Sequence, residues 1–404
     1  MVPAHAQSVP TGQGVGDRSR PDYDAIGSRI GAFTLYPSVT ATGEATDNYL
    51  ATDTNRRSDV FFVVRPELYL KSNWARDRVE ARAFVSQSVN AKLSGENATQ
   101  FGASVSSAYE PMRSTQFTLD LSGARYVESR SSLGSFQGSA EPVRFGIYRV
   151  GVGASHSFND LVLGLSAGVS RVDYDDTRFP NGVVVDQDYR DVRSVTAGGS
   201  ARYDLRNGIG LIVSGQYDDE RYDVRPGRPG YVPGVNINRD SSGFNLQGGV
   251  TLELSKLIFG SLQVGYISRR YIDPTLNDFG GLSFSGDVLW NITPLTSIRF
   301  RASRSIEDTS SPLIAGNTRS DFRLSVDHEL YRYVILSGDI GYGSFRPNGI
   351  GVGGDEYTVG IGARYLIDRR FSVTAGLRHS GRTSDSNFLR YQATSGNVGV
   401  RVNF

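Results

Sequence analysis

Apolar and polar residues alternate along the chain from Ile30 to its last residue. From Val334 to Tyr342, every second residue is Val, Leu, Gly, Ile or Tyr, whereas the residues between them are mixed. The same alternation recurs in segments 117–122, 298–303 and 397–404. A period of two residues is typical of β-strands whose two faces meet different surroundings. The sequence therefore predicts strands that each carry one apolar face.

Short and long connections alternate between these segments, which predicts strands joined as hairpins. Tight turns are expected at residues 73–77, 110–114, 159–160, 206–208, 255–256, 293–294, 331–332 and 368–369. Longer polar loops are expected at residues 45–57, 129–142, 176–188, 223–238 and 309–318, with a shorter one at 95–98. The pattern gives about eighteen strands in a hairpin repeat of roughly 40 residues. Weak punctuation near Ser94 and Asn277 leaves sixteen strands as the alternative.

The expected strands are long for a soluble sheet. They span about ten to fourteen residues, against ~5 in a propeller blade and ~9 to 11 in a tilted membrane crossing. Unpaired backbone groups are costly in hydrocarbon, so such strands must close into a barrel without edges. An even strand count places both barrel ends at the tight-turn end, which is periplasmic in bacterial outer-membrane barrels. The sequence therefore predicts an all-β, transmembrane, up-and-down antiparallel β-barrel whose long loops face outward.

Aromatic residues gather near both kinds of connection, as two membrane-interface girdles would require. From Tyr333 to Tyr342, strand rise and a tilt near ~40° give ~23 Å along the membrane normal, close to the ~25 Å apolar band. The alternative is a soluble sheet with one aromatic core. The girdle residues are expected to be Trp74, Tyr109, Phe158, Tyr203, Trp290, Tyr333, Phe371 and Phe404 near the tight turns, and Tyr126, Tyr174, Tyr217, Tyr266, Phe345, Tyr357 and Tyr391 near the long loops.

Composition narrows the class further. The 404 residues include 47 Gly, no Cys and 4 His. The longest apolar run, near residues 60–64, is far shorter than the ~20 residues of a spanning helix, which excludes helical membrane proteins. Lys and Arg total 43 and Asp and Glu total 42, with both signs interspersed. The sequence therefore shows no basic segment of the kind that binds nucleic acid. The absence of cysteine excludes disulfides, thiol catalysis and thiolate metal sites.

The first residues differ from the rest. Ala4-His5-Ala6 has the small-x-small form of a signal-peptidase site, so residues 1–6 are expected to be a signal-peptide remnant, with a chance match as the alternative. Residues 7–29 are polar and without periodicity, which predicts a disordered periplasmic arm. The barrel is expected to occupy residues 30–404.

Charged residues fall on the faces opposite the apolar ones, and a barrel of ~16 to 18 strands would give them an aqueous lumen. Near balance of their signs predicts weak ion selectivity and much mutual pairing. The alternative is that they mainly brace a wide barrel. The predicted pore-lining residues are Arg65, Glu67, Lys71, Arg82, Asp120, Arg149, Arg202, Asp218, Glu253, Asp287, Arg299, Arg301, Arg323, Asp327, Asp339, Arg364, Arg378 and Arg401.

Two loop features suggest further roles. The basic, Pro/Gly-rich loop at 223–238 could form a constriction through Arg225, Arg228 and Tyr231, or could merely shield the rim. The acidic clusters at 173–176 and 218–220 have the chemistry of a hard-cation site, but solvated loop charge is the simpler interpretation. The sequence therefore predicts no bound metal and no cofactor.

No enzymatic constellation is evident. His156, His328 and His379 are each isolated within a strand pattern. Ser380 neighbours His379, but adjacent residues of a strand point to opposite faces, so the two cannot form a dyad. The glycine-rich segment 348–354 joins two strand patterns without a following helix and is expected to be a loop. The sequence predicts a protein that is not an enzyme.

Several short motifs resemble the β-barrel porin type 2 family of Gram-negative outer-membrane proteins. They are Arg20-Pro21-Asp22-Tyr23-Asp24, Gly31-Ala32-Phe33-Thr34-Leu35-Tyr36-Pro37-Ser38, Asp47-Asn48-Tyr49 and Ser72-Asn73-Trp74. The resemblance implies an outer-membrane barrel with a porin-like role, often associated with exopolysaccharide synthesis or export, and it supplies no catalytic motif. The competing hypothesis is a non-conducting structural or binding barrel whose loops plug the lumen.

The resemblance also implies partners in the envelope. These are the lipid bilayer, lipopolysaccharide, a polysaccharide, and the barrel-assembly machinery, which the C-terminal strand ending in Phe404 is expected to engage.

Overall fold

The computed structural model describes residues 12–135, 138–233, 236–255, 257–307, 316–349 and 351–404. Within these residues an antiparallel sheet closes into an 18-stranded barrel, and one extra short strand pairs with the start of the first barrel strand. The signal-peptide remnant expected at residues 1–6 lies outside the described residues. The barrel strands are β2 Phe33–Thr46, β3 Asp59–Ser72, β4 Arg78–Asn90, β5 Ala98–Met112, β6 Thr115–Val127, β7 Arg144–Phe158, β8 Leu161–Tyr174, β11 Val192–Asp204, β12 Ile209–Tyr222, β13 Ser241–Leu254, β14 Ile258–Tyr271, β15 Phe279–Thr293, β16 Thr296–Glu307, β17 Asn317–Tyr331, β18 Val334–Pro347, β19 Gly354–Leu366, β20 Phe371–Ser384 and β21 Tyr391–Asn403.

Each barrel strand pairs with its neighbours in sequence, and β2 pairs with β21 to close the sheet. That closure runs from Ser38 opposite Asn403 to Thr46 opposite Ser395. The first strand therefore begins, and the last strand ends, at the same end of the barrel. This confirms the expected up-and-down topology with an even strand count.

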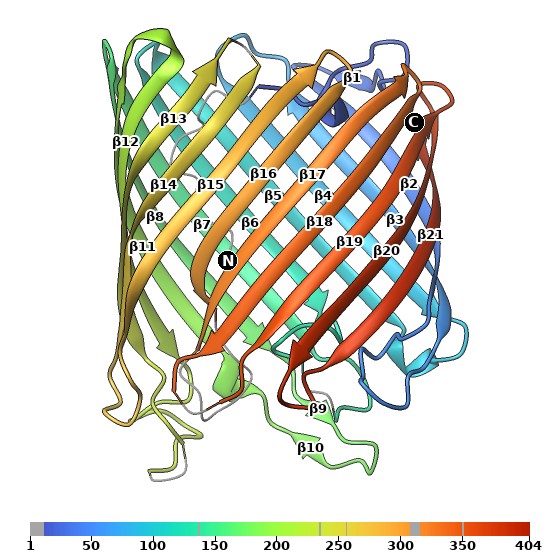
Figure 1. Ribbon diagram of the computed structural model, residues 1–404, viewed down its shortest axis with the longest axis vertical. Helices are drawn as coiled ribbons and strands as arrows, with labels where there is room; N and C mark the ends of the chain where they lie inside the picture. Colours follow the sequence, from blue (N-terminus) through green and yellow to red (C-terminus); the bar gives the residue numbers. More distant parts are fainter. Residues whose placement is uncertain (1–11, 136–137, 234–235, 256, 308–315, 350) are drawn as a thin grey trace.

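Tight turns and long loops occupy opposite ends of the barrel, at the top and bottom of Figure 1. Positive φ angles of 51° at Asn159 and 66° at Asn207 are the left-handed conformations that tight hairpin turns need and that Asn tolerates. We call the two ends of the barrel the tight-turn end and the long-loop end. The predicted alternation of connections is confirmed wherever both flanking strands are described.

Short strands and 3₁₀ helices lie outside the barrel strands. The extra strand β1 (Ser28–Ile30) pairs with the start of β2, and β9 (Thr177–Arg178) pairs with β10 (Val184–Val185) in the loop that follows β8. Among the described residues, no helix is long and apolar enough to cross a membrane. The short 3₁₀ helices are η1 Val15–Asp17, η2 Ser94–Glu96, η3 Asp188–Arg190 and η4 Arg206–Gly208.

The outer wall is covered by exposed apolar side chains. On β12, Leu211, Val213 and Tyr217 are exposed to 50%, 54% and 51%, and most other barrel strands also carry exposed apolar side chains at alternate positions. A continuous belt of this kind is far larger than the apolar patches of soluble monomers. The alternation predicted from the sequence therefore places apolar residues outside the barrel, rather than in a dry core.

The aromatic girdle is present on the outer face at the tight-turn end, where Trp74, Tyr109, Phe158 and their predicted companions are exposed. At the long-loop end the prediction is only partly correct. Tyr217 and Tyr266 face outward, but an inward orientation is found for Tyr126, Tyr174, Phe345 and Tyr391. The physical reason is strand parity. Tyr126, for example, is an odd number of residues from the outward Phe117, so its side chain points to the opposite face.

Residues 12–29 differ from the expected disordered arm. The backbone N–H of Val15 donates to Ser297 Oγ at 2.8 Å, and Arg20 forms a 2.8 Å ion pair with Glu329. The segment thus lies against the inner wall near the tight-turn end. Its polar composition gives no strand or helix signal, but suits contact with a charged lumen. Residues 7–11 of the predicted arm lie outside the described residues.

Candidate functional site

The inward faces of the strands carry charged and small polar side chains. On β17, Arg323 lies between Phe322 and Leu324, which are exposed on the outer face at 39% and 43%. Every residue predicted to line the pore is likewise an odd number of positions from an exposed apolar residue of its own strand, and so faces inward. Their role in solute passage stays a prediction.

Two arginine-rich triads lie on the wall formed by β15 to β20. Asp287 accepts hydrogen bonds from Arg299 Nε and Nη2, both at 2.7 Å, and lies 3.4 Å from Arg301 Nε. Asp339 accepts from Arg323 Nη2 at 2.9 Å and from Arg378 Nη2 at 3.3 Å. Six of the predicted lumen residues are thus brought together as two groups, each with one carboxylate between two guanidinium groups.

Other predicted lumen residues are not assembled in this way. Arg65 and Glu67 approach to 3.6 Å on β3, and Arg202 pairs with Asp204 on β11 at 2.9 Å. Asp218 instead accepts from Arg269 at 2.6 Å. Within the described part of the chain, no ion pair is formed by Lys71, Asp120, Arg149, Glu253 or Arg401.

Inward-facing aromatic rings form a row on the wall of β4 to β8. Consecutive ring centroids are 6.2, 6.0 and 5.3 Å apart, in the order Phe84, Tyr126, Phe145 and Tyr174. The Arg65 guanidinium lies 4.0 Å from the Phe84 centroid at one end, and the Arg190 guanidinium lies 3.8 Å from the Tyr174 centroid at the other. These cation–π contacts and stacked rings stiffen this side of the lumen.

Buried ion pairs join three loops at the long-loop end. Arg130, in the loop between β6 and β7, donates to both carboxylate oxygens of Glu96 at 3.0 and 2.6 Å. Glu128, at the start of the same loop, accepts from Arg190 in the loop after β8 at 2.6 Å. All four side chains are less than 10% exposed. Such pairs fix geometry, because breaking one leaves an uncompensated buried charge.

The loop between β6 and β7 also reaches a distant strand. Arg382 of β20 donates to the backbone carbonyl of Ser131 and pairs with Glu356 at 2.6 Å. Strands β21, β2, β3, β4 and β5 separate β20 from β6 around the wall, so a contact between them must cross the mouth of the barrel. Residues 128–143, of which 136 and 137 are not described, therefore form a crossing loop.

The loop predicted to form a constriction behaves differently. Arg225 donates to the Tyr222 carbonyl at 2.9 Å, and the N–H of Tyr231 donates to the carbonyl of Arg228 at 3.4 Å. The described contacts of Arg225, Arg228 and Tyr231 stay within the hairpin of β12 and β13. Positive φ angles of 80° at Gly227 and 81° at Gly230 fold the segment back on itself. The crossing loop is thus the one at 128–143, and a constriction formed by the loop at 223–238 stays a prediction.

Little in the sequence indicates that the loop at 128–143 crosses the mouth of the barrel. The crossing loop is dominated by Ser and Gly, and its partners Glu96, Arg190 and Arg382 are scattered along the chain. The charged residues Glu128 and Arg130, at the start of a segment rich in Ser and Gly, are the local feature that distinguishes it from a flexible connection.

The N-terminal arm contacts two of the predicted lumen residues. Arg364 Nη2 donates to the Gly16 carbonyl at 2.8 Å. Gly16 also lies so close to Asp327 that an added Cβ would be 2.7 Å from Asp327 Oδ2. A side chain at position 16 would therefore displace the Asp327 carboxylate, and the arm covers part of the charged wall at the tight-turn end.

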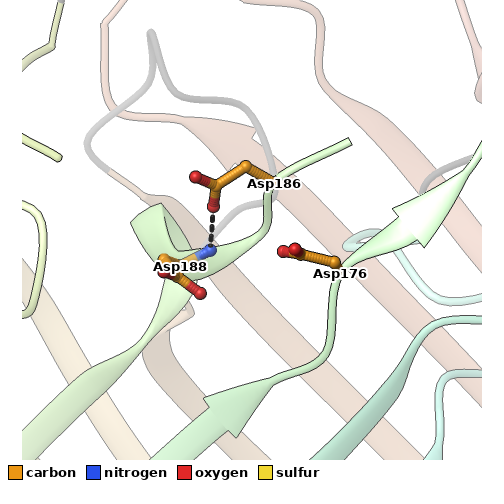
Figure 2. Close-up of side chains that lie close together, drawn as sticks. All are labelled: Asp176, Asp186 and Asp188. Atoms are coloured by element: carbon orange, nitrogen blue, oxygen red, sulfur yellow. Dashed lines mark hydrogen bonds between the residues drawn. The ribbon is translucent and has the colours of Figure 1, made fainter. Parts of the chain in front are cut away.

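Acidic side chains cluster in the loop that follows β8, but of the segment 173–176 singled out in the sequence only Asp176 belongs to the cluster. Figure 2 shows Asp176, Asp186 and Asp188, whose carboxylate oxygens lie within 4.8 Å of one another. Asp186 accepts the backbone N–H of Asp188 at 2.7 Å. Burial raises the pKa of Asp188, and the neighbouring Asp186 carboxylate raises it further. All three residues are exposed, and exposed carboxylates often lie this close without an ion, so we assign no metal to the cluster.

Asp191 lies beside this cluster. Its carboxylate accepts the backbone N–H of Tyr174 at 2.7 Å. Burial raises the pKa of Asp191 to about 7, an effect that Asp173 and Asp188 increase and the Tyr174 N–H opposes. The carboxyl group thus titrates near neutral pH.

The three histidines of the described residues face outward and are hydrogen-bonded across strands. His156, His328 and His379 each contact the threonine directly opposite in the sheet, at 2.7, 2.9 and 2.9 Å. The partners are Thr115, Thr296 and Thr394. These pairs do not bring a histidine into the lumen.

The chain was compared with known proteins. No curated protein matches it in sequence. A BenF-like porin from Pseudomonas fluorescens Pf-5 is 10% identical, with 92% of this chain and 99% of that chain covered and a TM-score of 0.46. OccK2 (OpdF) from Pseudomonas aeruginosa is 13% identical, with 92% and 98% covered and a TM-score of 0.47. The siderophore receptor PirA from Acinetobacter baumannii is 7% identical, with 93% and 81% covered and a TM-score of 0.49.

A family comparison is more decisive. The sequence model of the family described as "Putative beta-barrel porin 2" matches residues 20–404, which is nearly the whole chain. The match includes every barrel strand and most of the described N-terminal arm. It agrees with the motifs near the start of the chain that suggested the same family. The protein therefore belongs to the β-barrel porin 2 family.

Proposed function

We propose that the protein is a porin-like conduit in the outer membrane of a Gram-negative bacterium. Family membership supports the porin-like role, and the belt of exposed apolar side chains supports a position in a bilayer. In this orientation the tight turns are periplasmic and the long loops face outside. The function is non-enzymatic, and solutes move through the lumen without chemical change.

A single observation carries the proposal. Adjacent residues of one strand, such as Leu324 and Arg323, present an apolar side chain to one face and a charged one to the other. A dry interior would make the many inward charges prohibitively costly, whereas an aqueous lumen solvates them. The inward arginines therefore favour a water-filled barrel.

The finer role follows from the family resemblance. Members of the family are associated with exopolysaccharide synthesis and export, so we propose that a polysaccharide-related solute uses the conduit. The outer face would contact lipid and lipopolysaccharide. The C-terminal strand ending in Phe404 would engage the barrel-assembly machinery.

The test is single-channel recording of the purified full-length protein in planar bilayers. We expect steady unitary currents. A variant in which a short Gly/Ser linker replaces residues 129–142 should carry a larger current, because the crossing loop is removed. The matched control replaces residues 224–237, whose described contacts stay near their own hairpin, and should conduct like the wild type.

A second candidate function has its own support. Buried ion pairs hold the crossing loop in the mouth, as a plugged structural or binding barrel would require. In that case the protein recruits an envelope partner and does not conduct. A sealed bilayer containing inserted protein, even after residues 129–142 are replaced, would favour this function over the conduit.

A further inference from the structure

The lumen wall of β15 to β20 carries a continuous band of charge, which we call the arginine strip. In sheet order it consists of Asp287, Arg299, Arg301, Arg323, Asp339 and Arg378. The two triads described above make up this strip. Four guanidinium groups against two carboxylates leave it with a net positive charge.

The triads are joined where Arg301 and Arg323 lie directly opposite each other on β16 and β17. Like charges in this position repel each other. Each guanidinium is drawn toward its own carboxylate, Asp287 or Asp339, but the two arginines remain adjacent on the inward face. A pair of neighbouring guanidinium groups that share no counterion is suited to an anion placed between them.

Exposure differs between the two signs. Arg301, Arg323 and Arg378 have side chains 52%, 49% and 45% exposed, whereas Asp339 is only 16% exposed beneath its two arginines. In the other triad Asp287 is 44% exposed and Arg299 27% exposed. A solute in the lumen therefore meets guanidinium groups first at the Asp339 triad and at Arg301. The near balance of charge in the sequence does not reveal this, because counting residues ignores which ones reach the water.

A glycine on β19 leaves room for the triad of Asp339, Arg323 and Arg378. Arg378 of β20 reaches Asp339 of β18 across the intervening β19, at the position of Gly360. An added Cβ at Gly360 would lie 2.7 Å from Asp339 Oδ1 and 3.5 Å from Arg378 Nη2. The absence of a side chain at this position lets the ion pair span three strands.

Further arginines line other parts of the lumen wall. Arg65 and Arg149 face inward from β3 and β7, and both are exposed. Arg65 stacks on Phe84 at the end of the aromatic row and lies 3.6 Å from Glu67. An extended anion in the lumen would thus meet arginines beyond the strip as well.

We infer that the arginine strip is a binding track for carboxylate-bearing solutes, with the facing guanidinium groups of Arg301 and Arg323 as its central contact. This inference rests on the proposed function, since it names the solute class that the conduit favours. Planar arginine side chains suit carboxylates, which they can bind through paired hydrogen bonds. Neutral solutes of the same size would pass without this attraction.

The first test measures the zero-current potential of the full-length protein in a planar bilayer under a KCl gradient. The wild type should be anion-selective. The double variant Arg301→Gln/Arg323→Gln should lose most of this selectivity while keeping a measurable current. Arg113→Gln, in the exposed tight turn between β5 and β6, is the matched control and should behave like the wild type. Cation selectivity of the wild type, or no change in the double variant, would overturn the inference.

The second test compares block of the current by an oligogalacturonate and by a neutral malto-oligosaccharide of equal length. The acidic oligomer should bind at least about tenfold more tightly, which corresponds to one or two charge-assisted contacts. The double variant should remove the difference. Equal block by the two oligomers would contradict a carboxylate track, even with an open channel.

A barrel that does not conduct would refute the proposed conduit but would still allow the arginine strip to be tested. Calorimetric titration of the detergent-solubilised protein with the same two oligomers measures binding without conduction. Binding of the acidic oligomer by the wild type, lost in the double variant, would support the track. Absence of binding in the wild type would refute it. Heat-modifiable migration on gels verifies that both variants fold.

Discussion

Arg382 of β20 donates a hydrogen bond to the backbone carbonyl of Ser131, in the loop between β6 and β7. This contact ties one wall of the barrel to a loop that begins on another. The Arg382 side chain is buried, and its charge is balanced by Glu356 at 2.6 Å. The position of the crossing loop thus depends on an arginine more than two hundred residues away along the chain.

Arg382→Ala should release the crossing loop from β20. Because the Ser131 carbonyl loses its charged donor, we expect a larger and noisier single-channel current and faster protease cleavage within residues 128–143. Arg346→Ala is the matched control, since this half-exposed arginine pairs with Asp355 at the rim and contacts no distant loop. Equal currents in the wild type and Arg382→Ala would show that the contact does not restrain the loop.

Ile340→Arg should impair barrel assembly. Ile340 is 58% exposed in the middle of β18, and a charge on the lipid face near mid-bilayer costs about 2 to 4 kcal/mol. Ser337→Arg introduces the same side chain on the inward face of the same strand and should fold normally. Heat-modifiable gel migration and urea unfolding in lipid vesicles measure the difference. Identical behaviour of the two variants would mean that the faces of β18 are assigned incorrectly.

Gly360→Ala should disturb the triad of Asp339, Arg323 and Arg378. The new methyl group would lie 2.7 Å from Asp339 Oδ1, so the carboxylate must move toward the lumen. Anion selectivity should fall, as measured by the zero-current potential. Gly341→Ala on the neighbouring strand is the control, since its methyl group would meet nothing closer than 3.7 Å. A selectivity loss of equal size in both variants would argue against the triad as the cause.

The loop beside Asp191 should loosen as pH rises. Its folded-state pKa of about 7 is above the ordinary value of 3.8, so the folded state favours the protonated form. The associated stability is fully present below pH 3.8 and is lost as pH rises through about 7. Hydrogen exchange within residues 175–191 should therefore be faster at about pH 8 than at about pH 5, after correction for the intrinsic rate.

Asp191→Asn provides the control for this pH effect. An asparagine keeps an acceptor for the Tyr174 N–H but does not ionise, so the excess exchange at high pH should disappear. If the variant kept the full pH dependence, another group would have to be responsible.

Glu329→Gln should weaken the hold of the barrel on the N-terminal arm. The Arg20 side chain is 9% exposed in its ion pair with Glu329, and loss of a charged partner costs about 1 to 3 kcal/mol. Trypsin should therefore cleave after Arg18, which precedes Ser19 in the same arm, roughly tenfold faster in the detergent-solubilised variant. Glu329 contributes no backbone contact to the arm, so unchanged cleavage would mean that the Val15 and Arg364 contacts alone retain it.

Local patterns predicted the frame of the molecule well. The alternation around Leu336 and Ile340 identified the outer face of β18, and the tight turns near Asn159 and Arg206 placed the hairpins. These features depend on neighbouring residues, which a single sequence shows directly. The girdle assignment of Tyr126 and Tyr174 failed although the information was present, because their parity relative to outward residues was not counted.

Contacts between distant residues could not be predicted in the same way. Nothing near Ser131 indicates that Arg382 will be its donor, and nothing near Gly360 indicates a triad across β19. The loop containing Arg225 looked the better candidate for a constriction because it is basic and rich in proline. Its described turns fold it onto its own hairpin, and its role as a constriction stays a prediction, whereas the less distinctive Ser/Gly-rich loop crosses the mouth.

Pairing of β2 with β21 has a consequence for how the chain assembles. All the other neighbouring barrel strands are consecutive along the chain, and the closure entropy of their connections grows only slowly with loop length, so these hairpins can form one after another. The last seam joins residues from opposite ends of the polypeptide, such as Ser38 and Asn403, and must wait until all the others are in place. An assembly stalled before that step exposes two open strand edges, which are competent to zip onto another copy of the same chain.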